Sequence, residues 1–159
     1  MSHNIAAELL KDRPNASGIV FDLPQVTAEQ DKHVAQPENL SIRCHHVAGD
    51  MFVSVPEADV FILKHILHDW SDEERQRIHS VVRASAKRTS RLLICEWIVP
   101  GSSESHFAKI VDIAMLCISS GCQPTVAELT KLLSSTGLGI ENVRPLNGSP
   151  LAILKTAAS

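Results

Sequence analysis

The sequence predicts an α/β domain with a mostly parallel sheet, and three observations carry this prediction. Short apolar segments, typical of buried strands, alternate along the chain with stretches of helical periodicity. Two capping boxes, each a serine or threonine followed three residues later by a glutamate, mark helix starts at Ser71 and Thr125. Two strand-like runs then flank residues 147–150 (Asn-Gly-Ser-Pro), a pattern typical of a terminal hairpin.

The first third of the chain is expected to contain two helices and two strands. Apolar residues at helical spacing open it, and Pro14 ends that helix. In chain order there follow a strand at Gly18–Leu23 with Asp22 at its end, a helix at Thr27–Gln36, an extended segment at Ser41–Val47 and a loop at Gly49–Phe52.

The remaining segments repeat the alternation of strand and helix. In chain order we expect a buried strand at Val60–Leu67, a helix at Asp72–Lys87, a strand at Arg91–Val99, a helix through Phe107, Ile110, Val111, Ala114 and Ile118, a helix from Thr125 with Gly137 past its end, and hairpin strands at Ile140–Leu146 and Leu151–Thr156.

Composition narrows the functional classes. The 159 residues are enough for one domain with a real core, and the net charge of −3 without charge runs does not indicate a nucleic-acid or anionic-membrane surface. No segment is long and apolar enough to span a bilayer, and no signal-peptide pattern opens the chain, so a cytosolic protein is the default expectation. The four cysteines lack metal-ligand spacing, and Cys44 and Cys95 are expected to be buried thiols.

The segment with the clearest chemical content is the turn between the strand ending near Leu67 and the helix capped by Ser71. His68 lies on this turn, at the sheet edge where open α/β folds bind ligands. A histidine pKa moves across neutral pH with small changes of environment. His65, on the preceding strand, is interpreted as structural. The two histidines are not expected to bind a metal, because the sequence places no third ligand beside them.

Four motifs occur in a fixed order around this turn: F-D-L-P-Q-V at residues 21–26, G-D-M-F at 49–52, L-H-D-W-S-D-E at 67–73 and L-L-I-C-E at 92–96. Together they resemble the plant- and fungal-type small-molecule O-methyltransferases that use S-adenosylmethionine. The resemblance runs over nearly the whole chain but covers only the carboxyl-terminal portion of such an enzyme. It implies one Rossmann-like class I methyltransferase sandwich over residues 1–159, in truncated form.

The resemblance also implies a catalytic group. His68 matches the family's general base, and Glu96 matches an acid that orients this base. A hydroxyl needs such a base because its anion attacks the sulfonium methyl far better than the neutral oxygen does. The family has a second acid in a G-K-E-R-T segment. Here the corresponding stretch is 121–125, and Gln123 stands where the acid would be, able to hydrogen-bond but without charge.

Further positions match by resemblance alone. Singly, each could be a loop acid, a core methionine or a strand-edge lysine. In order, they indicate a cofactor site and a substrate site: Asp22 for the ribose hydroxyls, Asp50 and Met51 for the adenine, Lys64 near the cofactor, and Asp69, Met115 and Ser119 around the substrate.

Members of the family carry a strand and a glycine-rich loop before the first helix, and an amino-terminal domain that forms the dimer. Residues 1–4 fall where that loop is expected. We therefore expect weak binding of S-adenosylmethionine by the isolated chain. We also expect either a homodimer, a complementing partner chain, or direct pairing of the strands that flank the absent one.

Three functions remain open at this point. The first is O-methylation of an aromatic or polyketide-like hydroxyl in secondary metabolism. The second is a methyltransferase-derived protein that uses the pocket for proton transfer, as in a cyclisation, dehydration or isomerisation. The third is a partner subunit without catalysis of its own.

Overall fold

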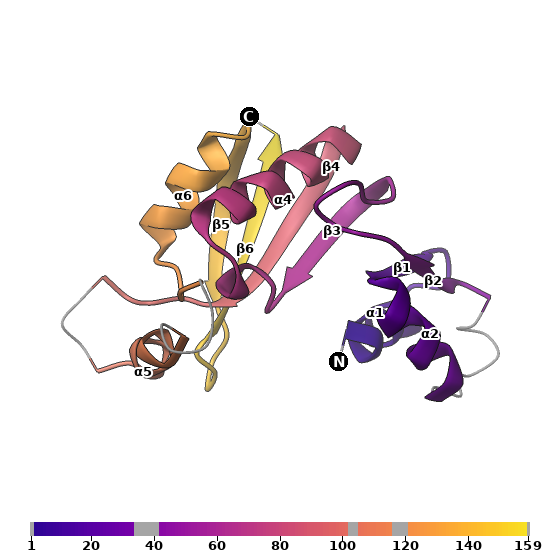
Figure 1. The fold of residues 1–159 in the computed structure, drawn as a ribbon, viewed down its shortest axis with the longest axis horizontal. Coiled ribbons are helices and arrows are strands. Elements are labelled where there is room, and N and C mark those ends of the chain that lie inside the picture. Colours follow the sequence, from indigo (N-terminus) through magenta and orange to yellow (C-terminus); the bar gives the residue numbers. More distant parts are fainter. Residues whose placement is uncertain (1, 34–41, 102–104, 116–120, 159) are drawn as a thin grey trace. The chain divides into compact units, whose positions relative to one another are not determined.

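The structure is a computed structural model that describes residues 2–33, 42–101, 105–115 and 121–158 (Figure 1). The chain divides into two compact units, Met1–Pro56 and Glu57–Ser159. No helix in the described ranges is long and apolar enough to cross a membrane.

The unit Met1–Pro56 contains a two-stranded parallel sheet. Its elements are α1 (Ser2–Lys11), β1 (Gly18–Asp22), α2 (Pro24–His33) and β2 (Cys44–Ala48). The register pairs Gly18 with Cys44 and Asp22 with Ala48, so both strands end at the same edge. Leu10 of α1, Val20 of β1 and Cys44 of β2 form the core of this unit. The second helix begins at Pro24 rather than at the predicted Thr27, since proline suits the first helical turn.

The unit Glu57–Ser159 is built on a four-stranded sheet. Its strands are β3 (Ala58–Lys64), β4 (Ala86–Trp97), β5 (Leu138–Pro145) and β6 (Leu151–Ala158), in the order β3-β4-β6-β5. β3 and β4 are parallel, whereas β6 runs antiparallel to both β4 and β5. The terminal hairpin is confirmed. Its second arm lies beside β4, so this sheet is mixed rather than mostly parallel.

Helices α4 (Asp72–Ser85) and α6 (Val126–Ser134) pack against each other on one face of this sheet (Figure 1). Both predicted capping boxes are present. Ser71 and Thr125 accept hydrogen bonds from the backbone N–H three residues on, and the glutamates bond back. Gly137 follows α6 with φ of +73°, a left-handed conformation that glycine adopts without strain. α5 (Phe107–Met115) completes the described helices of this unit.

Two predicted boundaries differ from the structure. β3 ends at Lys64 rather than Leu67, because His65 has a left-handed backbone (φ +53°) and residues 67–69 form the short 3₁₀ helix η1 (Leu67–Asp69). The sequence predicted that the helix ends at Lys87 and that the next strand begins at Arg91. In the structure no loop separates them, because α4 ends at Ser85 and β4 begins at Ala86.

Candidate active site

The site begins with the parallel pairing of β3 and β4. Their register places Lys64 opposite Cys95. The residues that follow each partner, His65 and Glu96, therefore lie next to each other at the carboxyl edge of the sheet. This is the edge where the sequence predicted the site, as expected for parallel strands in α/β folds.

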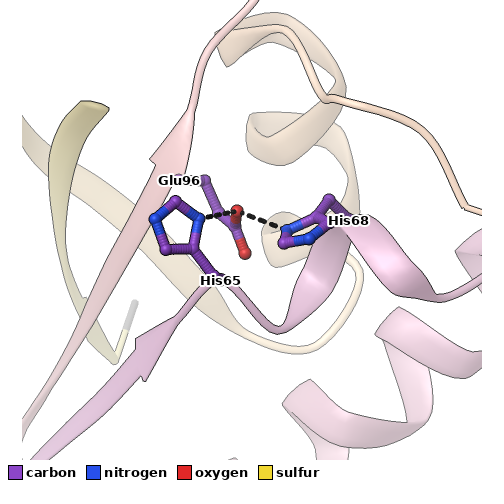
Figure 2. A group of neighbouring side chains, drawn as sticks. All are labelled: His65, His68 and Glu96. Atoms are coloured by element: carbon purple, nitrogen blue, oxygen red, sulfur yellow. Dashed lines mark hydrogen bonds and ion pairs between the residues drawn. The ribbon is translucent and has the colours of Figure 1, made fainter. Parts of the chain in front are cut away.

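Glu96 is fully buried and its carboxylate is held on both oxygens. Oε1 accepts hydrogen bonds from the backbone N–H groups of Ile66 and Leu67, each at 2.9 Å. Oε2 lies 2.9 Å from Nδ1 of His68 (Figure 2). Three polar partners compensate the cost of burying a carboxylate. The predicted pairing of Glu96 with His68 is therefore formed in the structure.

His68 lies on η1 with a side chain that is 15 % exposed. The hydrogen bond to Glu96 raises the pKa of His68 above its ordinary value. Burial opposes this rise, while the negative charges of Glu96 and Asp69 add to it. Nε2 of His68 lies 3.4 Å from Oδ1 of Asp69, which is half exposed. The two ring nitrogens thus face two carboxylates.

His65 takes part in the same cluster, although the sequence indicated only a structural role. Its Nδ1 lies 3.7 Å from Oε2 of Glu96, so Figure 2 shows both imidazoles directed at one carboxylate. Burial, followed by the charge of Lys64, lowers the pKa of His65. Its ring makes edge contacts with His68 and with Trp97, at centroid distances of 5.7 and 5.4 Å, and Trp97 in turn contacts Phe107.

Arg75 positions the turn, a role that was not predicted from the sequence. The guanidinium is buried, and it donates from Nε to the carbonyl of Leu67 at 2.7 Å and from Nη2 to the carbonyl of Cys122 at 2.6 Å. It thereby ties the histidine turn to the segment after α5. The signal was available: Arg75 lies three and seven residues before Ile78 and Val82, on the buried stripe of α4.

The segment from Gly121 to Thr125 packs against this turn. A Cβ atom on Gly121 would lie 1.9 Å from the carbonyl oxygen of His68, so only glycine fits there. The backbone N–H of Gln123 donates to Oδ1 of Asp112 at 2.7 Å. The side chain of Gln123 is buried, and its Oε1 has no hydrogen-bond partner in the described part of the chain. No hydrogen bond joins Gln123 to His68 in the described part of the chain.

The predicted cofactor residues fall into both units. Asp22 ends β1, and Asp50 follows the end of β2, so the parallel pairing brings them to one edge; the N–H of Gly49 also donates to the carbonyl of Asp22 at 2.9 Å. Met51 is half-buried in the next turn. Lys64 ends β3 in the other unit.

The predicted substrate residues have three different outcomes. Asp69 contacts His68, and Met115 is half-buried at the end of α5. Ser119 lies outside the described residues.

The described elements form an α/β fold that matches solved class I, Rossmann-like methyltransferase structures. Comparison with known proteins agrees: the O-methyltransferase domain family matches residues 3–139. The chain belongs to this family. The predicted resemblance is therefore confirmed.

The relatives are small-molecule O-methyltransferases. Phenazine O-methyltransferase PhzM of Lysobacter antibioticus is 34% identical over 152 residues, which are 95% of this chain and 44% of the relative. (R,S)-reticuline 7-O-methyltransferase of Papaver somniferum is 34% identical over 148 residues, 88% of this chain and 39% of the relative.

Solved structures give the same result. The crystal structure of LaPhzM matches with a TM-score of 0.89 and 34% identity, covering 96% of this chain and 46% of that chain. CalO1, a methyltransferase in calicheamicin biosynthesis in its SAH-bound form, matches with a TM-score of 0.87 and 31% identity over 96% and 45%. The chain spans less than half the length of these relatives.

Proposed function

We propose that this chain carries the catalytic portion of an O-methyltransferase of secondary metabolism. The proposed reaction transfers a methyl group from S-adenosylmethionine to a hydroxyl of an aromatic or polyketide-like small molecule. The observation that carries the proposal is the 2.9 Å contact between Nδ1 of His68 and Oε2 of the buried Glu96. The relatives named above, which are O-methyltransferases, support the same reaction class.

In this proposal His68 is the general base. With its proton on Nδ1, directed at Glu96, the ring keeps a lone pair on Nε2 that accepts the proton of the substrate hydroxyl. The imidazolium that forms lies between the carboxylates of Glu96 and Asp69, at 2.9 and 3.4 Å, which stabilise its charge. The same stabilisation raises the pKa of His68.

The residues present fit one part of the cofactor. Asp22 and Asp50 lie at one edge of the β1–β2 pair, and carboxylates there are suited to ribose hydroxyls. In the proposal Asp22, Asp50 and Met51 contact the nucleoside, and the bound cofactor supplies a methyl group on a positively charged sulfur. We expect the isolated chain to bind it more weakly than about 1 μM, roughly −8 kcal/mol.

Calorimetry and a methyl-transfer assay test this proposal. The full chain is titrated with S-adenosylmethionine, alone and mixed with the amino-terminal portion of a relative such as PhzM. Binding is expected in at least one case and should weaken in Asp22→Ala but not in Asp12→Ala, a matched change at an exposed acid of the same unit. Absence of binding in both cases would contradict the proposal.

The base assignment has its own test in any preparation that turns over a phenol. His68→Ala is expected to lower kcat at least a hundredfold, because a positioned base typically contributes that much. His106→Ala, at a half-buried histidine on a different loop, serves as the matched control. A His68→Ala variant that keeps its fold and its full turnover would show that another group is the base.

A second candidate function is proton-transfer chemistry without methylation. It is favoured by Gln123, where the resemblance expects a second acid: the buried amide supplies no charge to the histidine, and its Oε1 is unpartnered in the described residues. Gln123→Glu discriminates the two. A large gain in methyl transfer would support a weakened methyltransferase, and unchanged absence of transfer despite cofactor binding would favour the second function.

Assembly is part of the proposal. We infer that the chain functions as a homodimer or with a complementing partner chain. Within the described residues β3 pairs with β4 only, which leaves its other edge open. Val60 and Ile62 on this strand are 51% and 39% exposed. Open apolar strand edges favour association with a further strand.

A further inference from the structure

His65, His68 and Glu96 have the composition of a metal site as well as that of a base and its partner. Their ligand atoms all lie within 4.8 Å of one another. The sequence argued against a metal because it placed no third ligand beside the two histidines. The pairing of β3 with β4 supplies that third group, since Glu96 is 28 to 31 positions away in sequence but adjacent in space.

We propose that Nδ1 of His65, Nδ1 of His68 and Oε2 of Glu96 bind one divalent transition-metal ion such as Zn²⁺. Two imidazoles and a carboxylate are a ligand set that suits zinc and its neighbours. Around a tetrahedral zinc with bonds of about 2.0 Å, ligand atoms are about 3.3 Å apart. The two measured separations, 2.9 Å from His68 and 3.7 Å from His65 to Oε2, lie on either side of this value.

The groups around the three ligands match this role. Oε1 of Glu96 is fixed by the N–H groups of Ile66 and Leu67, whereas Oε2 faces the two imidazoles and is the ligand atom of the proposal. Nε2 of His68 faces Oδ1 of Asp69 at 3.4 Å, the carboxylate–histidine arrangement that orients metal-bound imidazoles. His65 is 30% exposed, so water can complete the coordination. Lys64 and Arg75 are the nearby positive groups that oppose a cation.

Metal binding and the base role of His68 need opposite tautomers. The base keeps a proton on Nδ1 and a lone pair on Nε2. The metal takes the lone pair of Nδ1 and leaves the proton on Nε2, facing Asp69. A bound ion would therefore switch the base off. The binding itself does not depend on the proposed methyltransferase function.

Calorimetry with Zn²⁺ on the metal-free full chain tests the proposal without any turnover. We expect saturable binding of one ion, weakened more than tenfold in His65→Asn and in Glu96→Gln. Asparagine tolerates the left-handed backbone of residue 65, so His65→Asn is expected to fold. His45→Asn, at an exposed histidine on β2, and Cys122→Ser are the matched controls and should bind as the wild type does.

Co²⁺ provides a spectroscopic readout of the ligands. Three nitrogen and oxygen ligands predict d–d absorption without a thiolate charge-transfer band, and loss of that absorption in His65→Asn. The proposal is overturned if no saturable zinc binding occurs below about 1 mM. It is equally overturned if His65→Asn binds like the wild type, or if a thiolate band appears and disappears in Cys122→Ser.

Discussion

At the scale of single residues, the unit Glu57–Ser159 buries two titratable side chains in opposite ways. Glu96 is fully buried and accepts three hydrogen bonds. His79 is also fully buried, but neither of its ring nitrogens has a hydrogen-bond partner in the described part of the chain. Burial, with a smaller contribution from the charge of Arg75, lowers the pKa of His79 to about 4. The carboxylate of Glu96 thus has polar partners inside the protein, whereas the ring of His79 has none among the described residues and stays neutral at neutral pH.

Glu96→Gln is expected to lower the pKa of His68. The substituted amide can donate its N–H to Nδ1, which favours the neutral ring, whereas the carboxylate favours the charged ring. In the wild type the raised pKa of His68 stabilises the fold below pH 6.5, and this stabilisation is lost as pH rises through the folded-state value.

An NMR titration of the His68 ring protons measures the effect of Glu96→Gln. Glu141→Gln is the matched control, because Glu141 pairs with Lys155 and lies on β5, at the opposite edge of the sheet from β3. An unchanged His68 pKa in a folded Glu96→Gln variant would contradict the assigned cause.

Because the pKa of the buried His79 is lowered, we expect the free energy of unfolding to decrease in mild acid. The unfolded chain takes up a proton near pH 6.5 and the folded chain only near pH 4, so the unfolding free energy falls as pH drops through this window. The total loss from a shift of this size is about 3 kcal/mol. His79→Leu is expected to remove the acid-dependent loss, and to be as stable as the wild type or more stable at pH 7.5, since it removes two unpaired buried nitrogens.

Urea unfolding at pH 7.5 and at pH 4.5 tests this prediction through tryptophan fluorescence, because Trp70 and Trp97, the two tryptophans of the chain, both lie in this unit. His106→Asn is the control, since asparagine keeps an acceptor for the N–H of Ala108. The same pH dependence in His79→Leu as in the wild type would show that other groups titrate there.

At the scale of elements, the histidine turn is held by parts distant in sequence. Arg75, on α4, bridges the carbonyls of Leu67 and Cys122. Gly121 lies in direct contact with the backbone of His68. The segment is further joined to the region after β4, where the N–H of Val99 donates to the carbonyl of Pro124 at 3.0 Å. The position of His68 thus depends on the close fit of a helix, a turn and a loop.

Gly121→Ala is expected to destabilise the unit by about 1–3 kcal/mol and to displace His68. The added Cβ would lie 1.9 Å from the carbonyl oxygen of His68, so the turn or the loop must move. Gly101→Ala is the matched control, because its Cβ meets nothing within 4 Å, and a change within about 0.5 kcal/mol is expected.

Urea unfolding and the chemical shifts of His68 measure both effects of Gly121→Ala. Equal stability of the two alanine variants, with His68 shifts as in the wild type, would show that the loop accommodates a side chain.

At the scale of the whole molecule, the described surface includes apolar areas that a soluble monomer rarely exposes. On α5, Phe107, Ile110 and Ile113 are 54%, 64% and 67% exposed. On β3, Val60 and Ile62 are exposed beside the strand's open edge. Both surfaces belong to the unit Glu57–Ser159.

We therefore expect the chain to self-associate, with a mass in light scattering near twice 17.4 kDa. A lysine on the open edge of β3 opposes strand addition, so Val60→Lys is expected to shift the equilibrium toward the monomer. Val53→Lys, at a 69% exposed loop valine, is the control. A mass of 17.4 kDa for the wild type over a wide concentration range would exclude the homodimer.

The sequence by itself determined the features that depend on neighbouring residues. The capping boxes at Ser71 and Thr125, the terminal hairpin and the turn that bears His68 are patterns within a few positions, and the structure confirms them. The pairing of Glu96 with His68 was also anticipated, but from the resemblance to a family rather than from spacing.

Only the tertiary structure decided how distant segments meet. The insertion of β6 beside β4, the approach of His65 to Glu96, the bridge from Arg75 to the carbonyl of Cys122 and the contact of Gly121 with His68 had no local pattern that led to their prediction. The physical reason is strand register: a shift of one residue between β3 and β4 would direct Glu96 to the opposite face of the sheet, and no sequence pattern near either strand specifies that pairing.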